Sequence, residues 1–262
     1  MVINEWITQP NQTAGICGFC AALYALYQTN VRYRQRFQEF SKTSVDKIIY
    51  SEVSYYIKQL IEKKEKEELE AQGVLSEIVE FTKLFGEKYF QVKNNNSMEE
   101  ENELDDVVFW AKILAKKFED ASSCHGDIEN LKPLGVAMTP RTILDYLKFA
   151  HERLGDPHPK LRLTQRIDQN DRVFNPDVDE AIIGVREDLN SELPSNTRML
   201  EEFHDYQQIA HWIYYCKGNL YQYGSIYKLL SLEDEDFIKY KKADSPSPPD
   251  KKEVICTITW SE

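Results

Sequence analysis

No apolar stretch of this 262-residue chain approaches the roughly 20 residues that a helix needs to cross a bilayer. The first ten residues, MVINEWITQP, also lack the basic segment followed by an apolar one that marks a cleaved secretory signal. These two absences predict no membrane span and no cleaved signal peptide.

The chain has fewer basic than acidic residues, with 32 Lys and Arg and 44 Asp and Glu, and its formal net charge is −12. Binding to nucleic-acid phosphates needs a basic face, so we expect no nucleic-acid partner. The same charge disfavours docking on anionic membrane surfaces.

Cysteine is scarce, with five residues that are odd in number and lack the spacing of a disulfide framework. This usage predicts a reducing compartment. We therefore expect a cytoplasmic protein, or one secreted into a target cell by a route without a cleaved signal.

The first half of the chain is predicted to be helical, because apolar residues recur at steps of three and four. Thr139 and Pro140 suit the cap and first position of one helix, and Gly155 lies near its end. A polar, acidic segment at 92–106 is expected to be a solvated loop. The helical runs lie at 30–42, 44–72, 73–90, 107–121 and 138–155.

From Asp156 onward prolines, Asn, Asp and short β-branched patches predict loops and short strands. The segment 210–229 reads as a hairpin around Lys217-Gly218-Asn219. A proline-rich connector is expected at 243–252 and a final strand at 253–260. Helices first and antiparallel strands last indicate an α+β fold. We expect a single domain over 1–262, with a helical insert at about 40–155.

Two thiols lie three residues apart in "NQTAGICGFCAALYALYQ" (11–28), which predicts a helix apolar almost all round and hence central. Cys17 would open this helix among unpaired backbone N–H groups, a placement that lowers a thiol pKa and offers donors to an oxyanion. Glycines at 15 and 18 would let a substrate backbone approach closely. Gln12 would add an amide donor to the same oxyanion hole. Cys17 is therefore the candidate nucleophile.

A nucleophilic thiol needs a base, and His211 is the best candidate because it opens the predicted strand HWIYY beside a bulky aromatic residue. Gln222, in the second strand of the hairpin, is the preferred partner for the imidazole. Asn219 and Asp205 are alternatives for that partner, and His204 is the alternative base.

The segment QTAGICGFCAAL, followed much later by AHWIYY, resembles the papain-like cysteine peptidase superfamily. It is most similar to the bacterial leader-peptidase branch and to effector and toxin domains that cleave or deamidate host proteins. The papain register would select Cys20 as the nucleophile, whereas the bacterial branches use the helix-opening cysteine, here Cys17. No tryptophan follows Cys20, and Gln12 lies five residues before Cys17 but eight before Cys20, which favours Cys17. A glutamine as third member is also found in a deamidating effector family of this fold.

The resemblance implies a papain-like α+β fold in which the Cys-bearing helix packs on a small C-terminal antiparallel sheet. It implies a cysteine hydrolase without a cofactor that attacks an amide carbonyl of a protein substrate, as a protease or a glutamine deamidase. A bacterial effector or toxin with a cognate inhibitor or immunity protein would be the biological setting.

Two alternatives from other classes stay open. The first is a non-catalytic helical interaction module with both thiols packed in its core. The second is a zinc-stabilised module in which Cys17 and Cys20 are joined by Cys124 and His125, although a structural site normally brings a second spaced pair.

Overall fold

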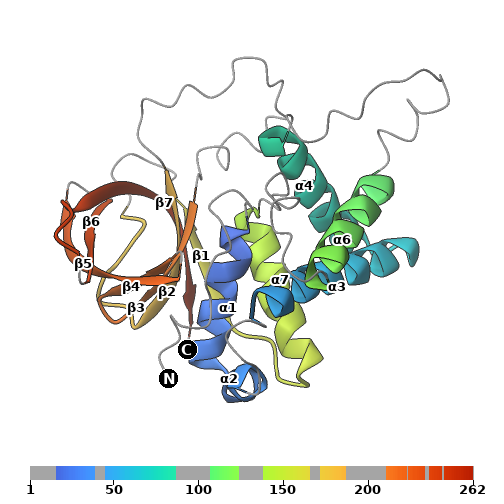
Figure 1. Cartoon of the computed structure of the whole chain (residues 1–262), viewed down its shortest axis with the longest axis horizontal. Coiled ribbons are helices and arrows are strands. Elements are labelled where there is room, and N and C mark those ends of the chain that lie inside the picture. The colour runs from blue at the N-terminus through green and yellow to red at the C-terminus, as the bar shows by residue number, and fades with distance from the viewer. Residues whose placement is uncertain are drawn as a thin grey trace.

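The computed structural model describes residues 16–38, 45–86, 107–123, 138–165, 172–186, 211–222, 224–233, 236–243 and 245–261. The helices there are α1 (Cys17–Thr29), α2 (Val31–Gln38), α3 (Val45–Glu65), α4 (Leu69–Gly86), α6 (Val107–Ser123) and α7 (Pro140–Arg153). The strands are β1 (Leu161–Gln165), β2 (Glu180–Arg186), β3 (His211–Cys216), β4 (Asn219–Gln222), β5 (Ser225–Glu233), β6 (Phe237–Lys242) and β7 (Asp250–Trp260). Helices and strands form two halves that lie side by side (Figure 1).

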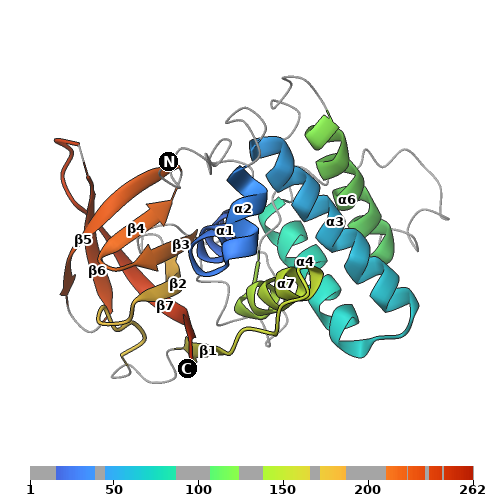
Figure 2. The ribbon, with the colours of Figure 1, turned by 90° about the horizontal axis from the view of Figure 1, so that it is seen from below.

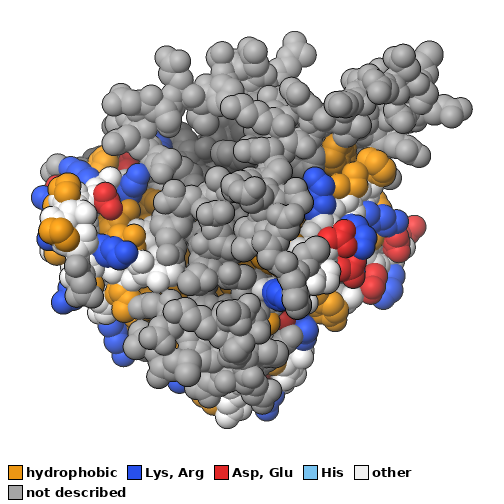
Figure 3. Space-filling model, in the orientation of Figure 1, with side chains coloured by type: hydrophobic (Ala, Val, Ile, Leu, Met, Phe, Trp, Pro, Cys, Tyr) orange, Lys and Arg blue, Asp and Glu red, His pale blue; other side chains and the backbone are white. Residues whose placement is uncertain are grey.

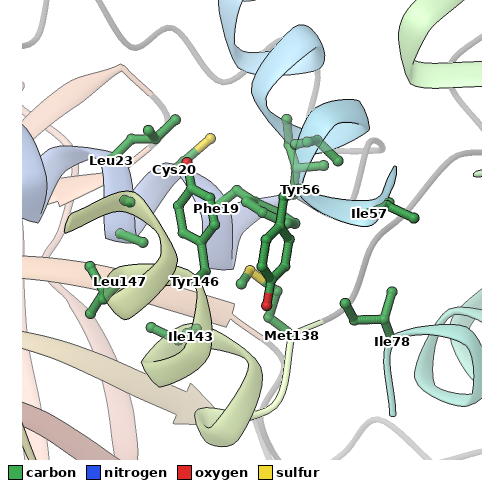
Figure 4. Close-up of a cluster of buried hydrophobic side chains, with 14 of the residues drawn as sticks. Phe19, Cys20, Leu23, Tyr56, Ile57, Ile78, Met138, Ile143, Tyr146 and Leu147 are labelled. Carbon is green, nitrogen blue, oxygen red and sulfur yellow. The ribbon is translucent and has the colours of Figure 1, made fainter. Parts of the chain in front are cut away.

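The helix α1 lies between the strands and the remaining helices (Figure 2). Every residue from Gly18 to Tyr27 is buried, which confirms the prediction of a central helix. Around its first turn the Phe19 ring meets the edges of Tyr146 and Tyr56, with ring centroids 4.9 and 5.9 Å apart (Figure 4). Such edge-to-face pairs add to the stabilisation from burial. The start of α1 is therefore held by aromatic packing against α3 and α7.

The predicted cap of α7 is confirmed. The Thr139 side chain accepts a hydrogen bond from the Thr142 backbone N–H at 3.1 Å, Pro140 is the first helical residue, and Gly155 has a φ of +68° just beyond the end. Thr139 also donates to Glu77 of α4 at 2.6 Å. The start of α7 is thus fixed to α4 as well as capped.

The strands close on themselves (Figure 1). The ring runs β7-β2-β3-β4-β5-β6, and the first residues of β7 pair with β6 to complete it. β1 is an extra strand on the second half of β7. The predicted hairpin turn is confirmed, because β3 and β4 are joined by Lys217 (φ 46°) and Gly218 (φ 82°), whose positive φ angles suit a two-residue turn. The hairpin is shorter than the predicted 210–229, since β4 ends at Gln222 and β5 begins at Ser225.

The predicted fold class is wrong. We expected an α+β, papain-like arrangement with the Cys-bearing helix on a small C-terminal sheet. The chain instead forms a closed six-stranded antiparallel barrel with one extra strand, together with six helices in the described residues. The barrel closes because β7 is 11 residues long and begins at Asp250, inside the segment 243–252 that was expected to be a connector.

Apolar side chains of alternate strand residues fill the barrel. They include Ala181, Ile183, Val185, Ile213, Tyr215, Leu220, Ile238, Tyr240 and Val254. The intervening residues Ile182, Trp212 and Tyr214 face α1, and together with Ile258 they belong to the larger core shared with the helices. The barrel therefore has a core of its own and a second apolar face that α1 covers.

The described surface of the helical half mixes both signs of charge, as Figure 3 shows over α3 and α6. Lys58 lies 2.7 Å from Glu119, and Lys116 lies 2.7 Å from Asp120. Both pairs are solvent-exposed and contribute little to stability. No helix in the described parts of the chain combines the length and the apolar composition that a membrane span requires.

Candidate active site

Cys17 is the first residue of α1, as the sequence predicted. Ile16 precedes it without a side-chain cap, and the first turn carries no acidic residue. Nearby backbone N–H groups, those of Trp212, Gly18 and Cys17 itself, instead favour the thiolate form of this half-buried side chain. The thiol therefore lies among amide donors at the positive end of a helix dipole.

The expected lowering of the Cys17 pKa is not what the site produces. Burial raises the pKa of the thiol to about 11, and the three backbone N–H groups only partly oppose that rise. Desolvation penalises the thiolate more than the helix end stabilises it. The resting thiol is protonated at neutral pH.

His211 and Gln222 lie together at one end of the barrel. His211 is the first residue of β3 and Gln222 the last of β4, and both are buried. They share a face with Ile213 and Leu220, because alternate strand residues point the same way. The Gln222 side chain hydrogen-bonds the imidazole and favours its protonated form, so the ring N–H donates and the amide oxygen accepts. The predicted pairing of these two residues is thus present.

The environment of His211 nevertheless keeps the imidazole neutral. Burial lowers its pKa to about 4, the hydrogen bond from the ring to Gln222 opposes this, and the nearby positive charge of Lys252 adds to it. A protonated imidazole would be poorly solvated at this position. Thiol and imidazole are therefore both neutral at pH 7.

Trp212 joins the two parts of the site. Its backbone N–H donates to the Cys17 sulfur, and His211 is its neighbour in β3. The fold thus brings the first turn of α1 to the start of β3, across nearly two hundred positions of sequence. The contact is with the β3 backbone, because His211 shares the barrel-facing side of β3 with Ile213, whereas Trp212 faces α1.

The alternative residues divide into two groups. Asn219 pairs with Cys216 at the opposite end of β3 from His211, so it does not contribute to this site. Gln12, His204 and Asp205 lie outside the described residues.

Gly18 does not have the role that the sequence suggested. A Cβ atom at Gly18 would lie 2.8 Å from both Cβ and Sδ of Met138, so the Met138 side chain occupies the space expected for a substrate backbone. Gly15 lies outside the described residues. Gly18 therefore serves close packing within the protein.

Cys20 is buried in the core shared by the helices and the barrel, near Phe19 and Tyr146 (Figure 4). Within the described ranges no group of three or more His, Cys, Asp or Glu side chains is arranged to hold a metal ion. The other proposed zinc ligands, Cys124 and His125, lie outside those ranges.

Sequence reasoning missed the contributions of Trp212, Met138 and Lys252. A backbone donor such as the Trp212 N–H leaves no side-chain signature. The position of Trp212 directly after His211 was the only signal available for it. Met138 and Lys252 reach the site only through long-range packing of α7 and β7.

No protein-family model, curated protein or solved structure matches this chain. The resemblance to cysteine peptidases therefore stays a prediction.

Proposed function

We propose that the protein is a cysteine hydrolase that attacks an amide carbonyl of a protein substrate. Cys17 is the nucleophile, His211 is the base and later the acid, and Gln222 holds the imidazole. The bond attacked is either a main-chain amide, as in a protease, or a glutamine side-chain amide, as in a deamidase.

One observation carries this proposal. The Cys17 sulfur accepts a hydrogen bond from the backbone of the residue next to His211, while the His211 ring is bonded to Gln222. A thiol, an imidazole and a side chain that orients the imidazole are the parts that thiol hydrolases require.

In the proposed reaction, the order of proton transfer starts from a neutral thiol and a neutral imidazole. Since the thiol and the imidazole are both neutral at rest, the proton leaves sulfur for His211 as the sulfur attacks the carbonyl carbon. Gln222 stabilises the resulting imidazolium because its oxygen accepts from the ring. His211 then protonates the leaving amine or ammonia, and water releases the thioester. Backbone N–H groups at the start of α1 stabilise the charge that develops during attack.

The same pKa values also favour a rival function, a non-catalytic interaction module. A buried thiol with a raised pKa and a buried neutral histidine are normal in a protein core. The rival predicts that Cys17 is no more reactive than other buried thiols. The effector or toxin setting, and an inhibitor or immunity partner, belong to the proposal through the sequence resemblance alone.

The test is a peptide mixture incubated with purified protein and read by mass spectrometry. New peptide termini indicate proteolysis, and conversion of glutamine to glutamate indicates deamidation. We expect one of these changes with the native chain and none with Cys17→Ala or His211→Ala.

Cys20→Ala is the matched control, since Cys20 is a buried thiol one helical turn away. Asn219→Ala is a second control at the far end of the hairpin. Equal turnover by the native chain and Cys17→Ala would reject the nucleophile. No turnover, together with an alkylation rate at Cys17 equal to that at Cys256, would favour the interaction module.

A further inference from the structure

Met138 contacts both elements that form the candidate site. Its side chain packs on Gly18 so closely that a Cβ there would lie 2.8 Å from Met138 Cβ and Sδ. Its backbone oxygen accepts a buried 2.9 Å hydrogen bond from the Trp212 indole Nε1–H. One residue thus touches the first turn of α1 and the start of β3.

Both contacts adjoin the groups that surround the sulfur. Gly18 follows Cys17 and gives it one backbone donor, and Trp212 gives it another. The Trp212 ring is also confined from its other side, since a Cβ at Gly184 would lie 3.0 Å from its Cζ3. A shift of Met138 would therefore move Trp212, and with it the backbone N–H that Trp212 directs at the Cys17 sulfur.

The helical half fixes Met138 in turn. The next residue, Thr139, caps α7 and donates to Glu77 of α4 at 2.6 Å, and Arg141 donates to the other oxygen of Glu77 at 3.0 Å. Met138 itself is buried in the core shared with α3 and α7 (Figure 4). A continuous set of contacts thus runs from α4 to the candidate nucleophile.

We infer that Met138 is a positioning residue that sets the separation between the start of α1 and the start of β3. It thereby holds the backbone N–H of Trp212 against the Cys17 sulfur. Its bearing on catalysis rests on the proposed role of Cys17 as nucleophile. Met138 acts through Gly18 and Trp212 and does not touch a reacting atom.

The experiment follows the rate at which iodoacetamide alkylates Cys17 from pH 7 to pH 10, read by mass spectrometry of the Cys17 peptide. Met138→Ala removes the side chain that packs on Gly18, and Gly18→Ala forces the same contact apart from the other side. In both variants we expect alkylation at pH 9 to fall about tenfold, the effect of weakening one hydrogen bond to a thiolate. Met138→Leu keeps the volume and is expected to keep the native rate.

Leu114→Ala is the control for general destabilisation, because Leu114 is a buried residue of α6 outside these contacts. Amide exchange at Trp212 provides a second readout, and we expect faster exchange in Met138→Ala than in Leu114→Ala at equal free energy of unfolding. An unchanged or faster alkylation rate in both Met138→Ala and Gly18→Ala would overturn the inference. Alkylation needs no enzymatic turnover, so this test stands even if the proposed hydrolase activity is absent.

Discussion

The buried neutral state of His211 predicts that this one residue makes the protein sensitive to acid. Burial lowers its folded-state pKa from 6.5 to about 4. Between these values the unfolded chain binds a proton that the folded chain does not, so stability falls as the pH is lowered. The contribution is present in full above pH 6.5 and lost as the pH falls through that value toward 4.

The magnitude follows from linkage. Each pKa unit corresponds to about 1.4 kcal/mol, which makes the whole effect about 3 kcal/mol. Because about three fifths of the range from 6.5 to 4 lies above pH 5, about 2 kcal/mol is lost between pH 7 and pH 5. For a domain stabilised by about 5–15 kcal/mol this is a large fraction.

The measurement is the free energy of unfolding in urea at pH 7, 6 and 5 for the native chain and His211→Gln. Glutamine keeps a polar group beside Gln222 but does not titrate. We expect the native chain to lose about 2 kcal/mol more than the variant over this range. Asn219→Ala, which changes no titratable group, is the control and should show the same loss as the native chain. Equal losses in the native chain and His211→Gln would refute the buried, neutral imidazole.

Three further outcomes are expected. The alkylation rate of Cys17 should rise about tenfold per pH unit from pH 7 to 10, because the pKa of its thiol is about 11. A rate that is already constant from pH 7 would instead indicate a preformed thiolate–imidazolium ion pair. Urea unfolding of Phe19→Ala should show a loss of about 3–5 kcal/mol, whereas Leu69→Ala at an 82% exposed position should stay within about 0.5 kcal/mol. Gly218→Ala should lower the free energy of unfolding by about 1 kcal/mol, because φ at this position is +82°. The loss comes from the backbone alone, since the added Cβ meets no atom within 4 Å. An unchanged melting temperature would contradict this.

The sequence predicted correctly those elements that are determined by residues close together in the chain. The cap at Thr139, the two-residue turn at Lys217 and Gly218, and the apolar helix that follows Cys17 all depend on residues within a few positions of one another. The predicted helix over 44–72 is less accurate, because the chain turns at Lys66–Glu68 with Glu67 at a φ of +64°. The residues there are good helix formers, so no local signal marked the break.

Barrel closure was missed for a different reason. Lys251 pairs with Lys239, and Lys252 pairs with Ile238, in a segment whose composition is that of a connector. Pairing between distant strands decides its structure and overrides its weak strand propensity. At the site, residue chemistry suggested Cys17, His211 and Gln222 as partners. The raised pKa of Cys17 was not foreseeable, because burial depends on the packing of the whole fold.

The order of strands has a consequence for synthesis on the ribosome. A nascent chain that has not yet emerged as far as β7 contains β2 and β6 with their backbone edges open, and open edges invite pairing with other chains. It also carries Cys17 long before His211 is made. Until β7 joins β2 to β6, the growing polypeptide is at its most vulnerable to aggregation, and a chaperone that covers strand edges would be most useful in that interval.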